Sequence, residues 1–217
     1  MNKLEYDKDS LTKQPWEHYL KQYAGTDPRS ISERLGLPYD EETHTLTVWF
    51  LGSTYRVTHP DFAVEHLPDE QGYYPLEEMI KAKILTLRYL LNGTNAESSG
   101  TFRTYREMPW GEVYLRQFDG RCIKRLAFTY GNRLADFAKI MDHLHAERIS
   151  QGDMSYELSI YPGYRVRMIL WEGDEEFPPS SQFLFSDNFP LSFEAEDIAQ
   201  MGDVLIGSLK SFQTNRG

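Results

Sequence analysis

Hydrophobic residues recur along the chain with two different spacings, and these divide it into helical and extended segments. Spacings of three and four residues predict helices, and they occur at 16–23, 31–35, 75–91, 123–130, 134–144 and 198–209. Alternation of apolar and polar residues predicts half-buried strands, and it occurs at 43–58, 102–106, 154–171 and 182–186. Strands and helices therefore follow one another in groups.

Capping residues set the ends of several predicted helices. Asp27-Pro28 supplies an N-cap followed by a first helical residue, and Gly36 is placed to close that short helix. Pro75 begins a longer helix that runs to Leu91, and Asn92-Gly93 ends it. The second helix and the helix at 75–91 are therefore predicted with definite boundaries.

Tight turns join the predicted strands in antiparallel pairs. Gly52-Ser53 predicts a two-residue type II′ hairpin, and Pro162-Gly163 predicts a type II turn. The polar segment 93–100 is too short to link two separate cores. We therefore expect a single α+β domain over residues 1–217, in which an antiparallel β-sheet built from hairpins packs against several α-helices.

Composition and charge narrow the possible partners. The chain has 217 residues and a formal net charge of -10, which predicts repulsion from nucleic acid and from anionic membranes. No signal-peptide core or membrane-length apolar run is found in the sequence, so a cytoplasmic protein is expected. Small basic clusters are expected to be solvated faces; they are Arg103 with Arg106, and Arg121 with Lys124 and Arg125.

Several common chemistries lack their usual residues in this sequence. The lone cysteine, Cys122, excludes an internal disulfide or a multi-cysteine cluster and is expected to be a small core residue. His143 and His145 are two positions apart, so on a helix their rings point in different directions. The sequence has no phosphate-binding glycine loop and no Gly-x-Ser-x-Gly elbow.

The most unusual segment is an acidic loop that follows a predicted strand. Its residues, with the aromatic residues at either side, are Trp171, Glu172, Gly173, Asp174, Glu175, Glu176 and Phe177. Such a loop could bind a hard cation, or raise the pKa of one carboxyl group for acid–base chemistry. The alternative is an exposed turn that Trp171, Phe177 and the following prolines anchor to the core.

A further carboxylate, Asp187, follows the next predicted strand. If it faces the same edge of the sheet, it would complete a ligand-binding rim with the acidic loop. A cation site there predicts thermal stabilisation by calcium or manganese that Asp174→Asn combined with Glu175→Gln removes. The identity of any metal or other cofactor is left open by the sequence.

The acidic loop, the segment Leu184-Phe185-Ser186-Asp187-Asn188 and the helix after Glu196-Asp197 together resemble the C-terminal signature of domain-of-unknown-function family 3786, an uncharacterised prokaryotic group. The similarity extends to Asp27-Pro28, to 45–55 and to 131–137, and so covers most of the chain.

The resemblance implies a metabolic context but no specific activity. Relatives look like proteins of anaerobic bacteria and archaea, and some are fused to a four-cysteine iron-sulfur domain of the kind found in corrinoid proteins. It therefore implies anaerobic redox or corrinoid-linked metabolism. Because this chain lacks the four cysteines, any cluster would belong to an iron-sulfur or corrinoid partner protein.

We favour a binding or accessory module, not an enzyme, that holds a small molecule or a partner at a sheet edge and an aromatic-lined cavity. One alternative is a hydrolase or isomerase that uses a carboxylate, with or without a metal. Such a carboxylate should be partly desolvated in a concave site. The other alternative is a pure protein-interaction domain, which should expose a flat apolar patch.

Overall fold

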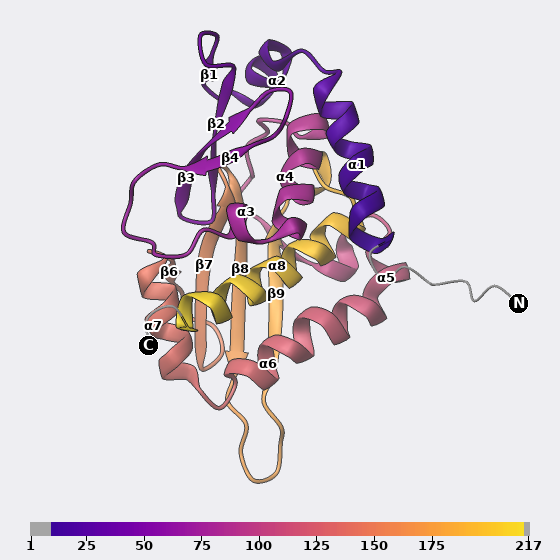
Figure 1. Cartoon of the computed structure of the whole chain (residues 1–217). Coiled ribbons are helices and arrows are strands. Elements are labelled where there is room, and N and C mark those ends of the chain that lie inside the picture. The colour runs from indigo at the N-terminus through magenta and orange to yellow at the C-terminus, as the bar shows by residue number, and fades with distance from the viewer. Residues whose placement is uncertain (1–9, 215–217) are drawn as a thin grey trace, which may run out of the picture.

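The computed structural model describes residues 10–214, which form an α+β fold with two antiparallel sheets (Figure 1). The predicted fold class is confirmed, although the strands form two sheets and not a single one. The four-stranded sheet has the order β1-β2-β3-β4, and the five-stranded sheet has the order β5-β9-β8-β7-β6. Neighbouring strands in both sheets are antiparallel.

The first sheet is built around the hairpin that the alternating segment 43–58 predicts. Its strands are β1 (Tyr39–Asp40), β2 (Thr45–Phe50), β3 (Ser53–Thr58) and β4 (Val64–His66). Phe50 pairs with Ser53, so the turn residues are Leu51 and Gly52. Both have positive φ, of 44° and 94°, which is typical of a type I′ turn. The predicted type II′ turn, placed one residue later, is therefore wrong.

The second sheet contains the longer hairpin, with Pro162-Gly163 at its turn as predicted. Its strands are β5 (Phe102–Thr104), β6 (Glu147–Arg148), β7 (Met154–Tyr161), β8 (Tyr164–Trp171) and β9 (Ser180–Ser186). The two-residue strand β6 is too short to give an alternating pattern, and the sequence does not predict it.

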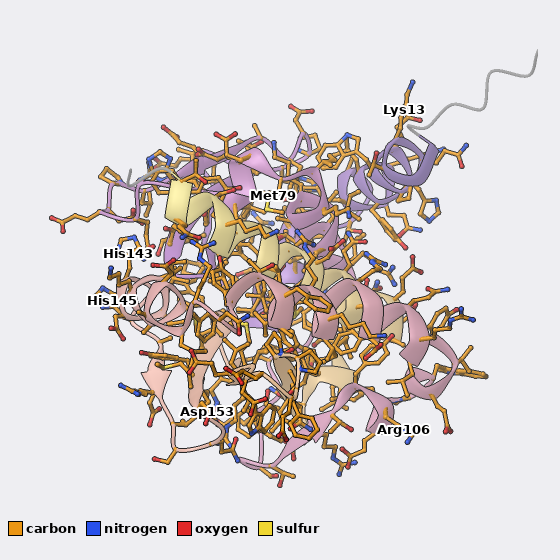
Figure 2. All side chains as sticks on the ribbon, turned by 90° about the horizontal axis from the view of Figure 1, so that it is seen from below. Lys13, Met79, Arg106, His143, His145 and Asp153 are labelled. Atoms are coloured by element: carbon orange, nitrogen blue, oxygen red, sulfur yellow. The ribbon has the colours of Figure 1, made fainter. Side chains whose placement is uncertain are left out.

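Helices pack on one face of the second sheet and beside the first. They are α1 (Ser10–Ala24), α2 (Pro28–Leu35), α3 (Pro75–Glu78), α4 (Ile80–Asn92), α5 (Gly111–Phe118), α6 (Lys124–Tyr130), α7 (Leu134–His143) and α8 (Ala195–Thr214). Helix α8 crosses in front of β7, β8 and β9 (Figure 1). Figure 2 shows the molecule from below, with Met79, between α3 and α4, near the top and Asp153, just before β7, near the bottom. Helices lie between these two residues.

Two helices differ from their predicted extents. The helix predicted at 75–91 breaks at Met79, whose backbone is extended (φ -107°, ψ 112°) and separates α3 from α4. The helix around 123–130 begins earlier, because α5, the π-helical segment η2 (Asp119–Ile123) and α6 are continuous. Two short 3₁₀ turns, η1 (Tyr105–Glu107) and η3 (Phe189–Leu191), complete the described elements.

The π turn keeps one side of this long helix buried. Phe118, Cys122, Leu126 and Tyr130 are all buried and are spaced four residues apart. A regular α-helix has 3.6 residues per turn, so side chains four apart would drift around its axis. The wider π turn reduces this drift.

One continuous hydrophobic core joins the two sheets. Tyr161 of β7 stacks on Tyr89 of α4 with ring centroids 4.2 Å apart, and it lies 5.1 Å from the ring of Phe50 in β2. The Leu51 amide donates a hydrogen bond to the Ile160 carbonyl across the sheets (3.0 Å). The hairpin turn of the first sheet is therefore fixed against the second.

Candidate functional site

The acidic loop is an exposed turn between β8 and β9. Asp174 Oδ1 accepts hydrogen bonds from the amides of Glu176 (2.8 Å) and Phe177 (2.7 Å), and these bonds hold the pKa of Asp174 below its usual value of 3.8. The remaining carboxylates, Glu172, Glu175 and Glu176, are exposed to solvent. The Asp174 carboxylate therefore stabilises the backbone of its own loop.

Of the anchors expected for an exposed turn, Pro179 contacts the rest of the protein but Phe177 is largely exposed. Phe177 is 67% exposed, so it does not hold the loop to the core. Gly173 instead packs on Pro179, where a Cβ atom would lie 2.6 Å from Cδ of the proline, and its amide donates to Asn132 Oδ1 (3.3 Å). The turn after α6 therefore supports the loop.

Asp187 lies at the other end of β9 from the acidic loop, so the expected common rim is not formed. Trp171 pairs with Ser180 at the loop end, whereas Asp187 follows Ser186 seven positions later. That separation corresponds to roughly 20 Å of extended strand. In an antiparallel hairpin, the residues after the second strand return to the end where the first strand began.

Asp187 and Asn188 stabilise the loop at 93–100. Asp187 accepts hydrogen bonds from the hydroxyls of Ser98 (2.6 Å) and Ser99, which lower the pKa of Asp187. Asn188 donates to the carbonyls of Ala96 (2.8 Å) and Gly163 (3.0 Å). This part of the signature therefore has a structural role, and the predicted ligand-binding role of the acidic loop and Asp187 stays a prediction.

A better-defined site is a cleft between α1, α4, η2 and α8, which we call the helical cleft. Its volume is about 390 Å³, within the range of small-molecule sites. Its lining residues are Thr12, Pro15, Tyr19, Lys81, Ile84, Arg88, Arg121, Glu196, Asp197 and Gln200. Three cationic side chains and two carboxylates thus meet in one concave site.

Three cations converge on a single carboxylate at one end of the helical cleft. Asp203 of α8 contacts Lys81 Nζ (2.7 Å), Arg121 Nη2 (2.9 Å) and Arg125 Nη1. The side chain of Asp203 is only 11% exposed. Although burial raises the pKa of Asp203, hydrogen bonds from Lys81 and Arg121 and their charges lower it overall. The cluster therefore carries more positive than negative charge, and Lys81 and Arg121 face the cleft.

A buried carboxyl group lies at the other end. Asp197 is 5% exposed, and burial raises its pKa to about 6, against the opposing effect of Arg88. Arg88 Nε lies 2.8 Å from Asp197 Oδ1, and the Glu194 amide donates to Asp197 Oδ2 (3.0 Å). Asp197 therefore caps the first turn of α8. Its carboxyl group also changes protonation at about pH 6.

The sequence holds only partial signals for this site. Glu196 and Asp197 at the start of the last helix, and the cluster with Arg121 and Arg125, are visible as charge patterns. Lys81 and Asp203 are 122 positions apart, and no local pattern joins them. Cys122 is a buried core residue, as predicted, and desolvation raises its pKa to about 12.

An exposed apolar patch lies at the start of α5. Trp110 is 76% exposed and has a left-handed backbone (φ 63°), and Val113 is 69% exposed. Tyr114 is also exposed, next to Val113. Such a patch is the feature expected of a protein-interaction surface.

Within residues 10–214, no group of three or more histidine, cysteine or acidic side chains is arranged to hold a metal ion. In the same range, no helix is both long and apolar enough to cross a membrane.

The fold and the helical cleft define an α+β protein with two antiparallel sheets and a charged cleft between helices. The family model for the domain of unknown function DUF3786 matches residues 27–208, so the chain belongs to this family. Helix α1, which supplies one wall of the cleft, precedes the matched region. No curated protein and no solved structure matches the chain.

Proposed function

We propose that the protein is a small-molecule-binding module that holds a small organic anion in the helical cleft. The observation that carries this proposal is the excess of positive charge at the Asp203 cluster. Lys81 and Arg121 line the cleft and share one carboxylate with Arg125. Arginine and lysine donors in a partly desolvated site bind carboxylate and phosphate groups well.

Charge at the opposite end of the cleft selects the rest of the ligand. Asp197 lines that end and would repel a second anionic group, whereas Glu196 lies close enough to interact electrostatically with Arg121. A hydroxyl, carbonyl or amide is favoured there, because Asp197 accepts or donates a hydrogen bond according to its protonation. The ligand class that fits is a small organic acid with one anionic end and one neutral polar end.

The test is a thermal-shift and calorimetric titration of the purified chain with lactate, which has one anionic end and one neutral polar end, and with succinate, citrate and inorganic phosphate, which should bind more weakly than lactate. A bound anion stabilises the folded state by mass action, so the melting temperature rises with its concentration. Lys81→Gln is expected to weaken binding roughly tenfold. Lys83→Gln, on the same helix but outside the cleft lining, is the matched control. No stabilisation by any of these anions, or equal effects of the two variants, would contradict the proposal.

A second candidate function is acid–base catalysis by Asp197, in a hydrolase or an isomerase. The observation in its favour is the pKa of about 6 in a concave site, because general acids and bases work best with a pKa near the working pH. Arg88 beside it would stabilise the ionised form.

This candidate predicts that turnover of a small ester, amide or hydroxy-acid substrate is lost in Asp197→Asn. The wild-type rate should depend on a group with an apparent pKa near that of Asp197. Turnover that survives Asp197→Asn with an unchanged pH profile would exclude the carboxyl as the catalytic group.

If the protein acts in redox or corrinoid-linked metabolism, a partner protein would carry the cofactor. The cleft of about 390 Å³ is too small to enclose a corrinoid macrocycle, so a corrinoid would have to be carried by the partner. Anaerobic purification followed by absorbance spectroscopy and metal analysis tests this setting. A colourless, metal-free preparation that fails to bind added corrinoid would remove it.

A further inference from the structure

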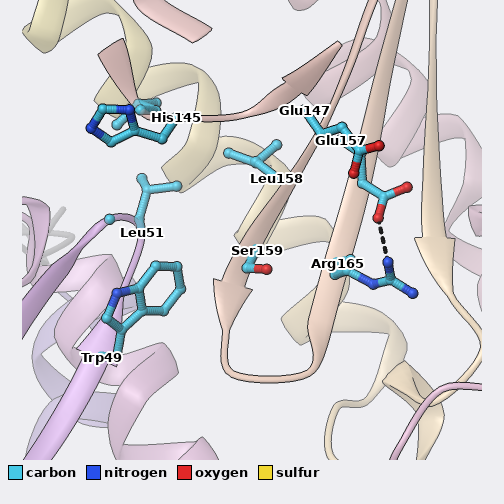
Figure 3. A pocket seen from close by; sticks show the side chains of 10 residues that line it. Trp49, Leu51, His145, Glu147, Glu157, Leu158, Ser159 and Arg165 are labelled. Carbon is cyan, nitrogen blue, oxygen red and sulfur yellow. Dashed lines mark hydrogen bonds and ion pairs between the residues drawn. The ribbon is translucent and has the colours of Figure 1, made fainter. Parts of the chain in front are cut away.

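A second cavity, separate from the helical cleft, lies where the β2–β3 turn meets the β6–β7 edge. Its volume is about 420 Å³. Figure 3 shows Trp49, Leu51 and His145 on one side and Glu147, Glu157 and Arg165 on the other, with Ser159 between them. We call it the sheet-edge cavity. Its walls combine an indole ring with both hydrogen-bond donors and acceptors.

Two lining side chains are held rigidly. Glu157 is 6% exposed, and its two oxygens accept hydrogen bonds from Arg165 Nη1 (2.7 Å) and Arg167 Nε (2.8 Å). The guanidinium of Arg167 lies 3.7 Å from the ring centroid of Phe102. Because these groups are already fixed by one another, binding would cost little side-chain entropy at this wall.

Other lining groups are available to a ligand. Within the part of the chain that the structure describes, the indole N–H of Trp49, the imidazole of His145, the carboxylate of Glu147 and the hydroxyl of Ser159 make no hydrogen bond to another residue. Ser159 also lies where the register of β7 and β8 shifts, and such bulges redirect side chains next to binding sites. Four side-chain groups therefore surround the cavity without a protein partner.

The charges of this wall are balanced, unlike those of the Asp203 cluster. Glu147 and Glu157 are directly opposite each other on β6 and β7. Arg165 and Arg167 both pair with Glu157, so the four side chains together carry no formal net charge. A small anion would meet the Glu147 carboxylate, and an organic cation would meet Arg165. A neutral ligand avoids both of these repulsive contacts between like charges.

Donors and acceptors that alternate around an aromatic ring suit a molecule rich in hydroxyl groups. A hydroxyl both donates and accepts, so it can pair with Arg165 as well as with Glu147. The partly exposed indole of Trp49 offers an apolar face, against which the C–H face of a sugar ring can pack. We infer that the sheet-edge cavity binds a neutral polyhydroxylated ring, either a free monosaccharide or a terminal sugar unit of a larger molecule.

The experiment is a nitrogen-15 amide NMR titration of the full chain with glucose, galactose, mannose, xylose, N-acetylglucosamine, maltose and cellobiose. Binding of at least one sugar with a millimolar or tighter dissociation constant is expected, with amide shifts at Gly52, His145 and Ser159. Stronger binding of a disaccharide than of its monosaccharide would indicate a sugar unit of a larger molecule; the reverse would indicate a free monosaccharide.

Variants connect that binding to the cavity. Trp49→Ala should weaken it at least tenfold, whereas Trp110→Ala, which removes an exposed indole elsewhere, should not change it. Glu147→Gln should weaken it severalfold without affecting folding, because the Glu147 side chain is exposed and makes no hydrogen bond or ion pair with the described residues. Lys81→Gln should leave sugar binding unchanged, which separates this inference from the proposed function.

Three results would overturn the inference. The first is the absence of amide shifts with every sugar in the panel. The second is sugar binding that both Trp49→Ala and Glu147→Gln leave unaltered. The third is tighter binding of tetramethylammonium than of any sugar, because that would identify the indole as a cation site.

Discussion

At the scale of single residues, burial separates carboxylates that are otherwise alike in the sequence. Asp174 is exposed and hydrogen-bonded to amides, and its pKa is lowered. Asp197 is buried, and its pKa rises to about 6. Both lie beside other acidic residues in the sequence, so charge density alone does not distinguish the group with the raised pKa from the group with the lowered pKa.

The first prediction concerns the titration of Asp197. Between pH 3.8 and about 6 the folded chain keeps a proton that the unfolded chain has lost, so the free energy of unfolding should fall as pH rises through this window. The full shift corresponds to about 3 kcal/mol. Carbon-13 NMR of the side-chain carboxyl groups, assigned with Asp197→Asn, measures the pKa, and that variant should lack this part of the pH dependence. A titration midpoint near 4 would contradict the prediction.

The second prediction concerns two glycines of one continuous helix. A Cβ at Gly111 would lie 1.9 Å from the Tyr105 carbonyl oxygen, whereas a Cβ at Gly120 meets nothing within 4 Å. Gly111→Ala should therefore lower the free energy of unfolding by about 2 kcal/mol or more. Gly120→Ala should leave it unchanged or raise it by up to about 1 kcal/mol. Urea denaturation of both variants measures the difference, and equal effects would be inconsistent with this packing.

At the scale of elements, the loops of the second sheet are fixed by side chains that bind backbone groups. Asp174 stabilises its own turn, and Asn188 joins the β7–β8 turn to the loop at 93–100. The family signature therefore includes residues that shape the ends of the long hairpin. Its acidic character is a surface property of the turn between β8 and β9.

The third prediction concerns this turn. Asp174→Ala removes the acceptor of two amide hydrogen bonds, so the amides of Glu176 and Phe177 should exchange with solvent faster. The melting temperature should change little, because the turn is exposed and the two lost hydrogen bonds lie within it and do not contact the core. Glu175→Ala, an exposed neighbour without a hydrogen bond to the described residues, is the control. Hydrogen-exchange mass spectrometry or NMR should show protection lost only in Asp174→Ala.

At the scale of the whole molecule, the two sheets share one core. Phe50 of the first sheet contacts Tyr161 of the second, and Tyr89 of α4 stacks on the same Tyr161 ring. Helix α8 contributes buried residues along most of its length. The helical cleft and the sheet-edge cavity each take their walls from segments far apart in the chain. The helical cleft is lined by residues of four helical segments, and the sheet-edge cavity is lined by residues of both sheets.

The fourth prediction is that the chain unfolds as one cooperative unit, as the single-domain hypothesis requires. Calorimetry should give a single transition whose calorimetric and van't Hoff enthalpies agree. Tyr161→Ala, which removes ring contacts between the sheets, should lower the melting temperature without splitting the transition. Two resolved transitions in the wild-type chain would show that the sheets unfold independently.

Local patterns were sufficient for most elements of the fold. The alternating segment at 154–171 and the Pro162-Gly163 turn predicted the long hairpin, and Asp27-Pro28 and Gly36 bounded α2. The break at Met79, the helix α5 and the short strands β1, β4 and β6 were missed. Methionine is not a helix-breaking residue, so nothing in the sequence marks the break at Met79. Strand β6 is too short for an alternating pattern to be recognised.

The sequence by itself determined the α+β class and most of the strands and helices, because these depend on spacing and capping between near neighbours. Membership of the family followed from the resemblance of its motifs. The tertiary structure decided which charges face each other. It placed Asp187 away from the acidic loop and brought Lys81, Arg121 and Arg125 to Asp203. The reason is that the electrostatic environment of a side chain depends on distance in space and on burial, and neither is encoded in a local pattern.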